Sequence, residues 1–407
     1  MANFDYGPLF SDDTGAKMLE EMKKQSSSMA AMAASSVASA MTSFMSVSRL
    51  ADLGRAKDFL TIGDILSDKW IDKAAENHEY TLDWRVVDFR DIELKDGEIL
   101  KERPIIMTKY TPPYGMQFSQ YRAFKKCPEG LPAGTYYITF AQAWSNLTSD
   151  HLVWHFTLTQ DIPAGGRIAG FRAMADWSGS TAPKIYAYGA GGLTVQETVD
   201  AAEGASGTDL GTIGYTSRNG DLNNMQETFY GYNRYIYSAA RKYILSLADK
   251  NLWWTASDEW DCAPDAAATI PGFMSGLSDD FLSAIKPFKQ VTWPNNFEET
   301  AGTLDVTYDL LTLPTFEDIN IEPYKAGEST PLAYWIRRSG SSKLLPRYVA
   351  RPEYKFYGVK DPTSSLYVWM RSANVDHRCS GGCVSPSGGP NGSNARTSMA
   401  LPLIAAL

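Results

Sequence analysis

The chain has 407 residues, of which 47 are acidic and 38 basic, giving a formal net charge of −9. This length predicts two to three domains, and an acidic chain without a long run of Lys and Arg lacks the electrostatic footprint of a nucleic-acid-binding protein. Four Cys are too few for a disulfide scaffold. The 22 Tyr and 11 Trp favour a β-rich architecture.

Residues 1–79 are predicted to be an N-terminal helical region. Within it, the uncharged stretch Met29–Val47 has apolar residues at helical spacing (Met29, Ala33, Val37, Met41, Phe44), separated mainly by Ala and Ser. The stretch is too polar to span a membrane and begins too late for a secretory signal. It either packs on its own protein's sheet or bundles with copies of itself. A second helical piece is expected over 61–80, from the spacing of Ile62, Ile65, Leu66 and Trp70.

Residues 80–214 are predicted to be a β-rich domain, a small sandwich or jelly-roll. Apolar residues alternate along 152–158, and two Pro-Ala-Gly turns precede strand-like runs at Tyr136 and Arg167. A Gly-, Ala- and Asp-rich patch over 203–214 is expected to mark the border with the next domain. His151 and His155 have the spacing of a zinc pair on a helix, but on a strand they would lie about 13 Å apart, too far for one metal.

Residues 215–407 are predicted to be a separate domain with a helix over 237–247. Five large apolar residues in apolar segments should belong mainly to its core: Trp253, Trp254, Leu313, Trp335 and Trp369. Cys379 and Cys383 lie in Gly-rich sequence. They could close a small disulfide or remain incidental thiols, bind a metal together with His377, or act in redox chemistry.

The last forty residues carry the candidate ligand-binding site. Residues 367–372 alternate as a strand does, 374–396 are polar and Gly-rich, and an apolar run follows from Met399. A long loop between two core strands is typically functional or disordered, and the flanking aromatics favour a displayed loop. The candidate contact residues are its exposed donors and acceptors: Asn374, Asp376, His377, Arg378, Ser380, Asn391, Ser393 and Asn394.

Several motifs occurring in order resemble a domain of unknown function found in virion proteins of gut-bacterial phages. They are the segments 231–245, 253–255, 272–277, 280–285, 313–317, 334–340 and 369–373. That family is similar to the C-type-lectin fold of phage tropism determinants and formylglycine-generating enzymes. The resemblance implies a C-type-lectin-like C-terminal domain, a virion setting, and a binding face in the C-terminal region.

The sequence and the resemblance together predict an α+β multidomain virion protein. It would be a surface-exposed head fibre, capsid decoration or tail-associated adhesin, made in the host cytoplasm. Its expected partners are itself (as a homotrimer), other virion proteins through the N-terminal region, and a bacterial surface glycan or protein. Neither nucleic-acid binding nor membrane insertion is expected, and no cofactor, metal or catalytic residue is predicted. The alternative is an enzyme of the formylglycine-generating or glycan-hydrolysing type. Phosphate-loop, Gly-x-Ser-x-Gly and zinc-protease motifs are missing from the sequence, which favours the virion protein.

Overall fold

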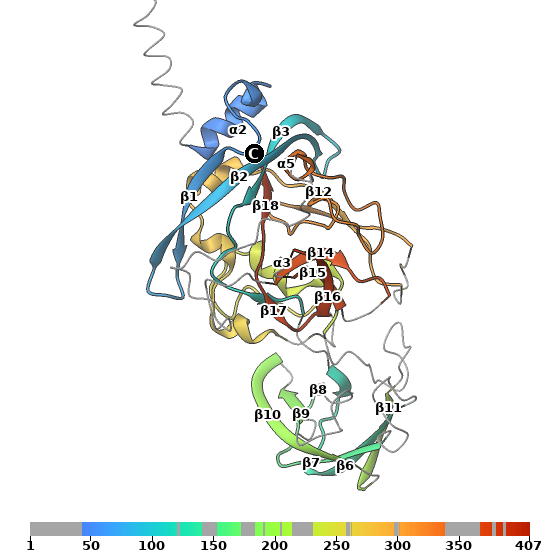
Figure 1. Cartoon of the computed structure of the whole chain (residues 1–407). Helices are drawn as coiled ribbons and strands as arrows, with labels where there is room; N and C mark the ends of the chain where they lie inside the picture. Colours follow the sequence, from blue (N-terminus) through green and yellow to red (C-terminus); the bar gives the residue numbers. More distant parts are fainter. Residues whose placement is uncertain are drawn as a thin grey trace, which may run out of the picture.

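The computed structural model describes residues 43–119, 123–140, 153–171, 184–189, 192–203, 206–213, 231–257, 261, 263–296, 300, 302–337, 367–376, 380–385 and 388–407. Helices and strands both contribute, so the expected α+β class is confirmed in this coarse form. Figure 1 shows a larger body that contains the helices and the C-terminal strands, with a smaller module of strands beside it.

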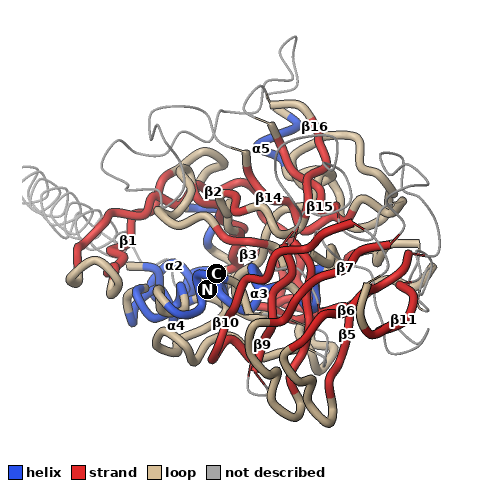
Figure 2. Tube along the Cα trace, turned by 90° about the horizontal axis from the view of Figure 1, so that it is seen from below, coloured by secondary structure: helices blue, strands red, loops and turns tan. Residues whose placement is uncertain are grey.

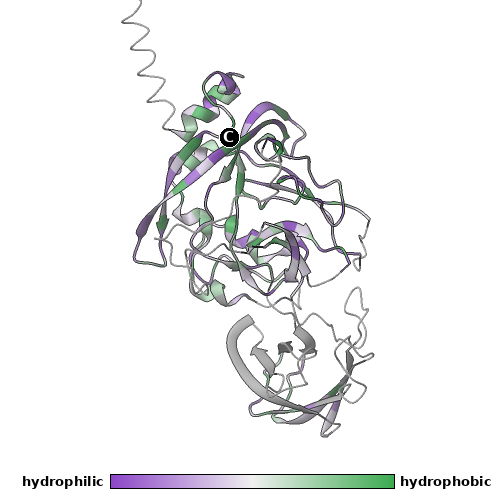
Figure 3. Cartoon of the chain, in the orientation of Figure 1, coloured by the Kyte–Doolittle hydropathy of each residue, from purple (hydrophilic) through white to green (hydrophobic). Residues whose placement is uncertain are grey.

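The body is organised around a four-stranded antiparallel sheet in the order β1-β2-β3-β18. Its strands are β1 (Ile65–Asp72), β2 (His78–Glu93), β3 (Ile99–Thr108) and β18 (Ile404–Ala406). The last strand therefore pairs with β3, which lies near the start of the described chain. All three residues of β18 are buried, and hydrophobic residues follow this strand through the middle of the body (Figure 3).

The helical prediction over 61–80 is wrong, because residues 65–72 form strand β1. Its side chains alternate between exposed and buried, and the buried face carries Leu66, Asp68, Trp70 and Asp72. Two of these four are acidic. The Asp72 carboxylate accepts a hydrogen bond from Tyr114 Oη (2.6 Å), and the Trp70 indole stacks on Phe273 (5.5 Å). The buried aspartates hide the period of two that an apolar face would have displayed.

The described N-terminal end of the chain is helix α2 (Phe44–Asp52), which lies against α4 (Asp279–Ala284) (Figure 2). Phe44 and Val47 are buried, and the Phe44 ring meets Phe281 edge to face at 4.8 Å. The Asp280 carboxylate accepts hydrogen bonds from Ser43 Oγ (2.6 Å) and from the backbone N–H groups of Phe44 (2.7 Å) and Met45 (3.2 Å). It thereby satisfies donors that the first helical turn leaves unpaired. The predicted helix upstream of Ser43 lies outside the described residues.

A seven-stranded sheet, in the order β11-β6-β7-β10-β9-β8-β5, forms the smaller module. Its strands are β5 (Ala123–Cys127), β6 (Gly134–Phe140), β7 (Val153–Leu158), β8 (Gly166–Phe171), β9 (Lys184–Gly189), β10 (Gly192–Glu203) and β11 (Thr208–Ile213). The expected strands after both Pro-Ala-Gly turns are confirmed, as is the burial of Phe156 and Leu158 on one face of β7. The predicted border patch contains β11, which pairs in parallel with β6. His151 lies outside the described residues, and His155 is half-buried on β7.

The module is inserted into the body between two neighbouring points of the chain. The chain leaves the body at Ser119, and the described part of the body resumes at Gly231. A Cβ atom on Gly231 would lie 2.9 Å from the carbonyl oxygen of Ser119. Gly231 also has a φ of +88°, a backbone conformation that favours glycine. Residues 80–119 are grouped with the middle of the chain by their place in the sequence. In the structure their strands belong to the body. Strand β2 pairs with β1 and β3, β3 also pairs with β18, and β4 (Met116–Gln117) pairs with β17 (Ser398–Met399).

Short elements complete the body between Gly231 and the C-terminal strands. They are η3 (Tyr235–Tyr237), α3 (Ala239–Ile244), η4 (Asp265–Ala268), η5 (Phe273–Gly276), β12 (Phe288–Thr292), β13 (Asp305–Asp309) and α5 (Ala333–Ile336); η1 (Ala56–Asp58) follows α2 near the start of the described chain. The helix expected over 237–247 is confirmed as the shorter α3. The core assignment is confirmed for Trp253, Leu313, Trp335 and Trp369, and Trp254 is partly buried. No described helix is long and apolar enough to cross a membrane.

Two bidentate ion pairs fasten the segment around α3 to strand β13. The Arg234 guanidinium donates to both carboxylate oxygens of Asp305 (2.8 and 2.6 Å), and Arg241 does the same to Asp309 (2.8 and 2.6 Å). The two aspartates stand at the two ends of β13, so the helix is fixed in both position and orientation. This anchors the chain beside Asn233, which supports the candidate site.

Candidate ligand-binding face

The candidate face is built on a three-stranded antiparallel sheet of β14 (Val368–Ala373), β15 (Ser380–Val384) and β16 (Pro390–Asn394), in that order. The prediction of strand β14 is confirmed. The prediction of one long loop over 374–396 is wrong in large part, because 380–384 and 390–394 are paired strands. Polar residues of this segment lie instead on β16, a strand at the edge of the described sheet.

Strand β15 could not be recognised from the sequence, because glycines occupy positions where a strand would usually carry apolar side chains. A Cβ atom on Gly381 would lie 2.9 Å from Cζ3 of Trp369, and one on Gly382 would lie 2.6 Å from the carbonyl oxygen of Ser372. Both distances are shorter than a carbon atom tolerates, so β15 packs on its neighbours through its backbone. Trp369 itself is fully buried and donates its indole N–H to the carbonyl of Met116 (2.9 Å).

The predicted contact residues are partly brought together. Asn374 is half-buried at the end of β14, Asp376 is exposed, and Ser380 begins β15. Asn391 and Asn394 are exposed on β16, with the half-buried Ser393 between them. His377 and Arg378 lie outside the described residues, as does Cys379. The described members thus gather on one small sheet and at the end of the strand that leads into it.

Buried asparagines support the connection between β14 and β15 from beneath. Asn233 is fully buried, and its Nδ2 donates to the carbonyls of Asn374 (3.1 Å) and Ser380 (2.8 Å). Asn295, also fully buried, donates from Nδ2 to Oδ1 of Asn233 (2.8 Å). The Asn296 backbone N–H bonds the carbonyl of Val375 (2.7 Å). Both ends of the connection are therefore fixed by residues distant in sequence.

The exposed carboxylate of Asp376 is held from the side. Asn296 Nδ2 donates to Asp376 Oδ1 (3.1 Å), and the Asp376 backbone N–H donates to Asn374 Oδ1 (3.3 Å). A displayed segment whose base is rigid loses little conformational entropy when it binds a partner.

Sequence reasoning missed these supporting asparagines. Their one signal was a polar residue within an aromatic segment, as in Gly231-Tyr-Asn-Arg-Tyr and Trp293-Pro-Asn-Asn. Buried amides of this kind must find partners, since an unpaired buried polar group is costly.

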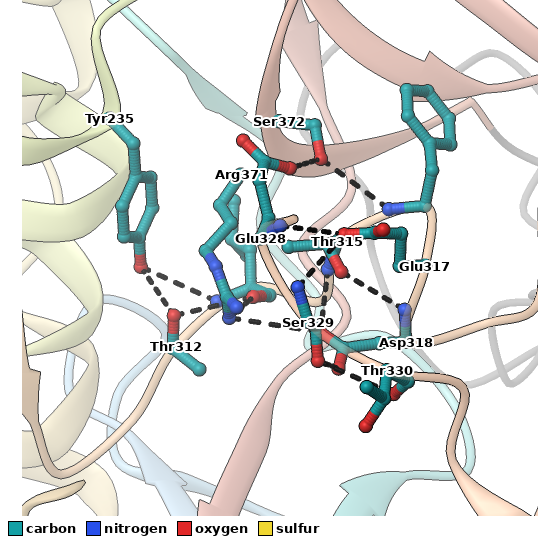
Figure 4. Close-up of polar contacts among 12 residues, drawn as sticks. Tyr235, Thr312, Thr315, Glu317, Asp318, Glu328, Ser329, Thr330, Arg371 and Ser372 are labelled. Atoms are coloured by element: carbon teal, nitrogen blue, oxygen red, sulfur yellow. Dashed lines mark hydrogen bonds and ion pairs between the residues drawn. The ribbon is translucent and has the colours of Figure 1, made fainter. Parts of the chain in front are cut away.

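A buried polar network lies behind the sheet (Figure 4). The guanidinium of Arg371, on β14, is almost fully buried; Nη1 donates to the carbonyl of Leu313 (3.0 Å) and lies 3.7 Å from Asp318 Oδ2. Glu328 is also buried, and its carboxyl group accepts hydrogen bonds from the Trp293 backbone N–H (2.9 Å) and from Ser372 Oγ. Burial raises the pKa of Glu328 to about 7, although hydrogen bonds and Arg371 oppose this.

Glu317 fixes the loop that runs from this network to the candidate face. Its carboxylate accepts the backbone N–H groups of Gly327 (3.0 Å), Glu328 (2.7 Å) and Ser329 (2.8 Å). The same loop carries Tyr324, whose ring packs edge to face on Phe316 (5.5 Å). Tyr324 had no signal in the sequence, because it follows a proline in an irregular segment.

Cys383, one of the two cysteines singled out in the sequence, is buried in β15. Burial raises the pKa of its thiol to about 12, so the thiol stays protonated and a weak nucleophile at neutral pH. Among the described residues, no group of three or more His, Cys, Asp or Glu is arranged to hold a metal ion.

No family model, curated protein or solved structure matches this chain.

Proposed function

We propose that this chain is a structural protein of a phage virion that displays the β14–β16 sheet to bacterial surfaces. Its place would be a head fibre, a capsid decoration or a tail-associated adhesin. The observation that carries the proposal is the exposed polar edge strand β16 and its neighbouring connection, held on a rigid base by Asn233 and Asn295. Binding residues positioned by a rigid scaffold are typical of recognition proteins.

Two architectural details belong to the same proposal. The ordered motifs of the C-terminal half support a C-type-lectin-like fold for residues 215–407. A sandwich or jelly-roll arrangement of the inserted module is supported by β10, which pairs with β9 along 192–200 and with β7 along 201–203. Because β10 pairs with β9 over most of its length and with β7 at its end, it can bend so that the strands on its β9 side pack over those on its β7 side.

A non-enzymatic role is supported by the buried, protonated thiol of Cys383. Formylglycine-generating enzymes, which the sequence resembles in part, use a pair of cysteines in this region. A thiol with its pKa raised to about 12 is poorly suited to that chemistry at neutral pH.

We also infer a homotrimer, assembled through the segment before α2 and attached by that segment to other virion proteins. Because Phe44 and Val47 of α2 belong to the core, the deletion that tests this should remove residues 1–42 and retain Ser43. Light scattering should then give slightly less than one third of the mass of the full chain's assembly, because each monomer also lacks the deleted segment. An unchanged mass together with unchanged incorporation into particles would contradict the inference.

The main experiment combines location and adsorption. Cryo-electron microscopy of intact particles should place the protein on the outer surface. Replacing Asp376, His377 and Arg378 together with Ala should abolish adsorption of the purified chain to host cells while the melting temperature stays nearly unchanged. Retained adsorption by this variant would show that the β14–β15 connection is not part of the binding site.

A further inference from the structure

Three polar side chains converge on a backbone position that has no side chain. A Cβ atom on Gly392, in β16, would lie 2.8 Å from Ser380 Oγ, 3.2 Å from Tyr324 Oη and 3.3 Å from Asn374 Nδ2. These residues come from the start of β15, the Glu317-fixed loop and the end of β14. We refer to Asn374, Ser380, Tyr324 and Gly392 as the Gly392 cluster.

The three polar atoms of the Gly392 cluster make no hydrogen bond to any other described residue, although the residues themselves are well fixed. The backbone of Asn374 is bonded to Ser380 and Asn233, and its Oδ1 accepts from Asp376. Tyr324 remains 39% exposed while its ring rests on Phe316. Partial burial raises the pKa of Tyr324, so the phenol keeps its proton as a donor at neutral pH. The cluster therefore offers oriented hydrogen-bonding groups to solvent.

The chemistry of the cluster is neutral. It consists of an amide, a hydroxyl and a phenol, and residues 380–395 contain no Asp, Glu, Lys, Arg or His. The nearest cation on the Tyr324 loop, Lys325, lies with its amine 3.6 Å from the centre of the Trp293 ring. A ligand bound at the cluster thus meets hydroxyl and amide partners beside an aromatic ring; the exposed Asp376, whose backbone N–H bonds Asn374 Oδ1, lies outside the cluster.

We propose that the Gly392 cluster is a binding site for an uncharged sugar unit of a bacterial surface glycan. A sugar presents several hydroxyl groups that both donate and accept, and a C–H face that packs on an aromatic ring. The cluster matches both features with Asn374, Ser380 and Tyr324. Gly392 belongs to the site because the missing side chain leaves these groups open to a ligand. This inference rests on the proposed display function and specifies its ligand.

The test uses the full-length protein and ligand-observed saturation-transfer NMR with neutral hexoses and N-acetylhexosamines as probes. Gly392→Ala adds one methyl group where the polar atoms meet, at a residue whose φ is not in the positive range. Tyr324→Phe removes only the phenol hydroxyl. Gly389→Ala is the matched control, because a Cβ atom there lies at an ordinary 3.7 Å from Ser385 Oγ.

At least one neutral sugar should show saturation transfer with the wild type and with Gly389→Ala. Gly392→Ala and Tyr324→Phe should each weaken binding by about tenfold, the effect of losing one well-made hydrogen bond. Equal signals from the wild type and Gly392→Ala, or no signal from any neutral sugar, would overturn the assignment.

Cell adsorption separates this inference from the function on which it rests. If periodate treatment of host cells abolishes adsorption of the wild-type chain and protease treatment does not, the glycan ligand is supported. If only protease treatment abolishes adsorption, the partner is a protein; the sugar site is then refuted and the display function stands. If the chain adsorbs to no host cell, the display function itself fails.

Discussion

The buried carboxyl group of Glu328 should make the stability of the body depend on pH in an unusual direction. Raising its pKa from 4.5 to about 7 corresponds to about 3 kcal/mol, because each tenfold change in proton affinity is worth about 1.4 kcal/mol. The folded protein holds this proton more tightly than the unfolded chain does. The free energy of unfolding should therefore fall as the pH rises from about 4.5 through 7.

Glu328→Gln tests this by keeping the shape of the side chain and removing its charge. The amide can still accept from the Trp293 N–H and can donate to Ser372 Oγ, so both contacts survive. Thermal unfolding of the wild type and the variant at pH 5, 6, 7 and 8 should show the variant gaining stability relative to the wild type as the pH rises. The gain should level off above about pH 8.

Glu322→Gln is the control, since Glu322 is exposed on the same loop; its difference from the wild type should not change with pH. A constant difference between the wild type and Glu328→Gln at all four pH values would refute the reasoning. In that case the charge of Arg371 would be holding the buried carboxylate ionised.

Three further predictions concern the supports of the fold and the site. Asp280→Ala should destabilise the protein by about 1–2 kcal/mol in denaturant unfolding and speed proteolysis near α2, because it removes the cap of that helix; Asp279→Ala, the exposed neighbour, should have little effect. Asn233→Ala should lower the free energy of unfolding by about 1–3 kcal/mol, because the Asn295 amide and the Asn374 carbonyl lose a hydrogen-bond partner. Backbone amide exchange should also accelerate between residues 374 and 380 more than elsewhere. Arg234→Lys should destabilise the protein, because one amine cannot replace the bidentate contact with Asp305; equal melting temperatures would show that the pair is dispensable.

The elements that could be predicted from sequence are those in which apolar residues face the core. Strands β7 and β14 and helix α3 belong to this group, as do the buried positions Trp253, Leu313 and Trp369. Each has a local pattern that a neighbouring sheet or helix completes. In these segments, local preference and tertiary packing agree.

The strands that escaped prediction bury acidic residues or glycines at positions where a strand would usually carry apolar side chains. Strand β1 buries Asp68 and Asp72 with hydrogen-bond partners, which conceals its alternation. Strand β15 buries Gly381 and Gly382 so closely against Trp369 and Ser372 that no side chain fits. The contacts that stabilise both strands are made with residues outside the strand itself, and no local pattern contains that information.

The candidate site divides in the same way. Polar residues on β16 could be named from composition, because exposed donors and acceptors are visible as letters in the sequence. Asn374 and Ser380 of the Gly392 cluster could be named in the same way, but Tyr324 and Gly392 could not, because only the fold brings Tyr324 and the β16 glycine next to them. A site assembled from three segments around a glycine appears only when the backbone is in place.

The pairing of β18 with β3 sets an order on how this chain can fold. The contact between the backbone N–H of Leu403 and Thr108 Oγ1 (3.0 Å) joins residues 295 positions apart. During synthesis, β1, β2 and β3 leave the ribosome well before β18 does. The four-stranded sheet of the body therefore cannot be completed until β18 has also left the ribosome. The strands of the inserted module pair with partners that are much nearer in sequence, so the module can form before the end of the chain is made. Contacts of high sequence separation form slowly, and until they form, β3 presents an open edge to which other chains can pair. The nascent protein therefore passes through a stage in which the module is folded and the body is not. We expect the yield of folded protein to depend on how well the open edge of β3 is kept from aggregating during that stage.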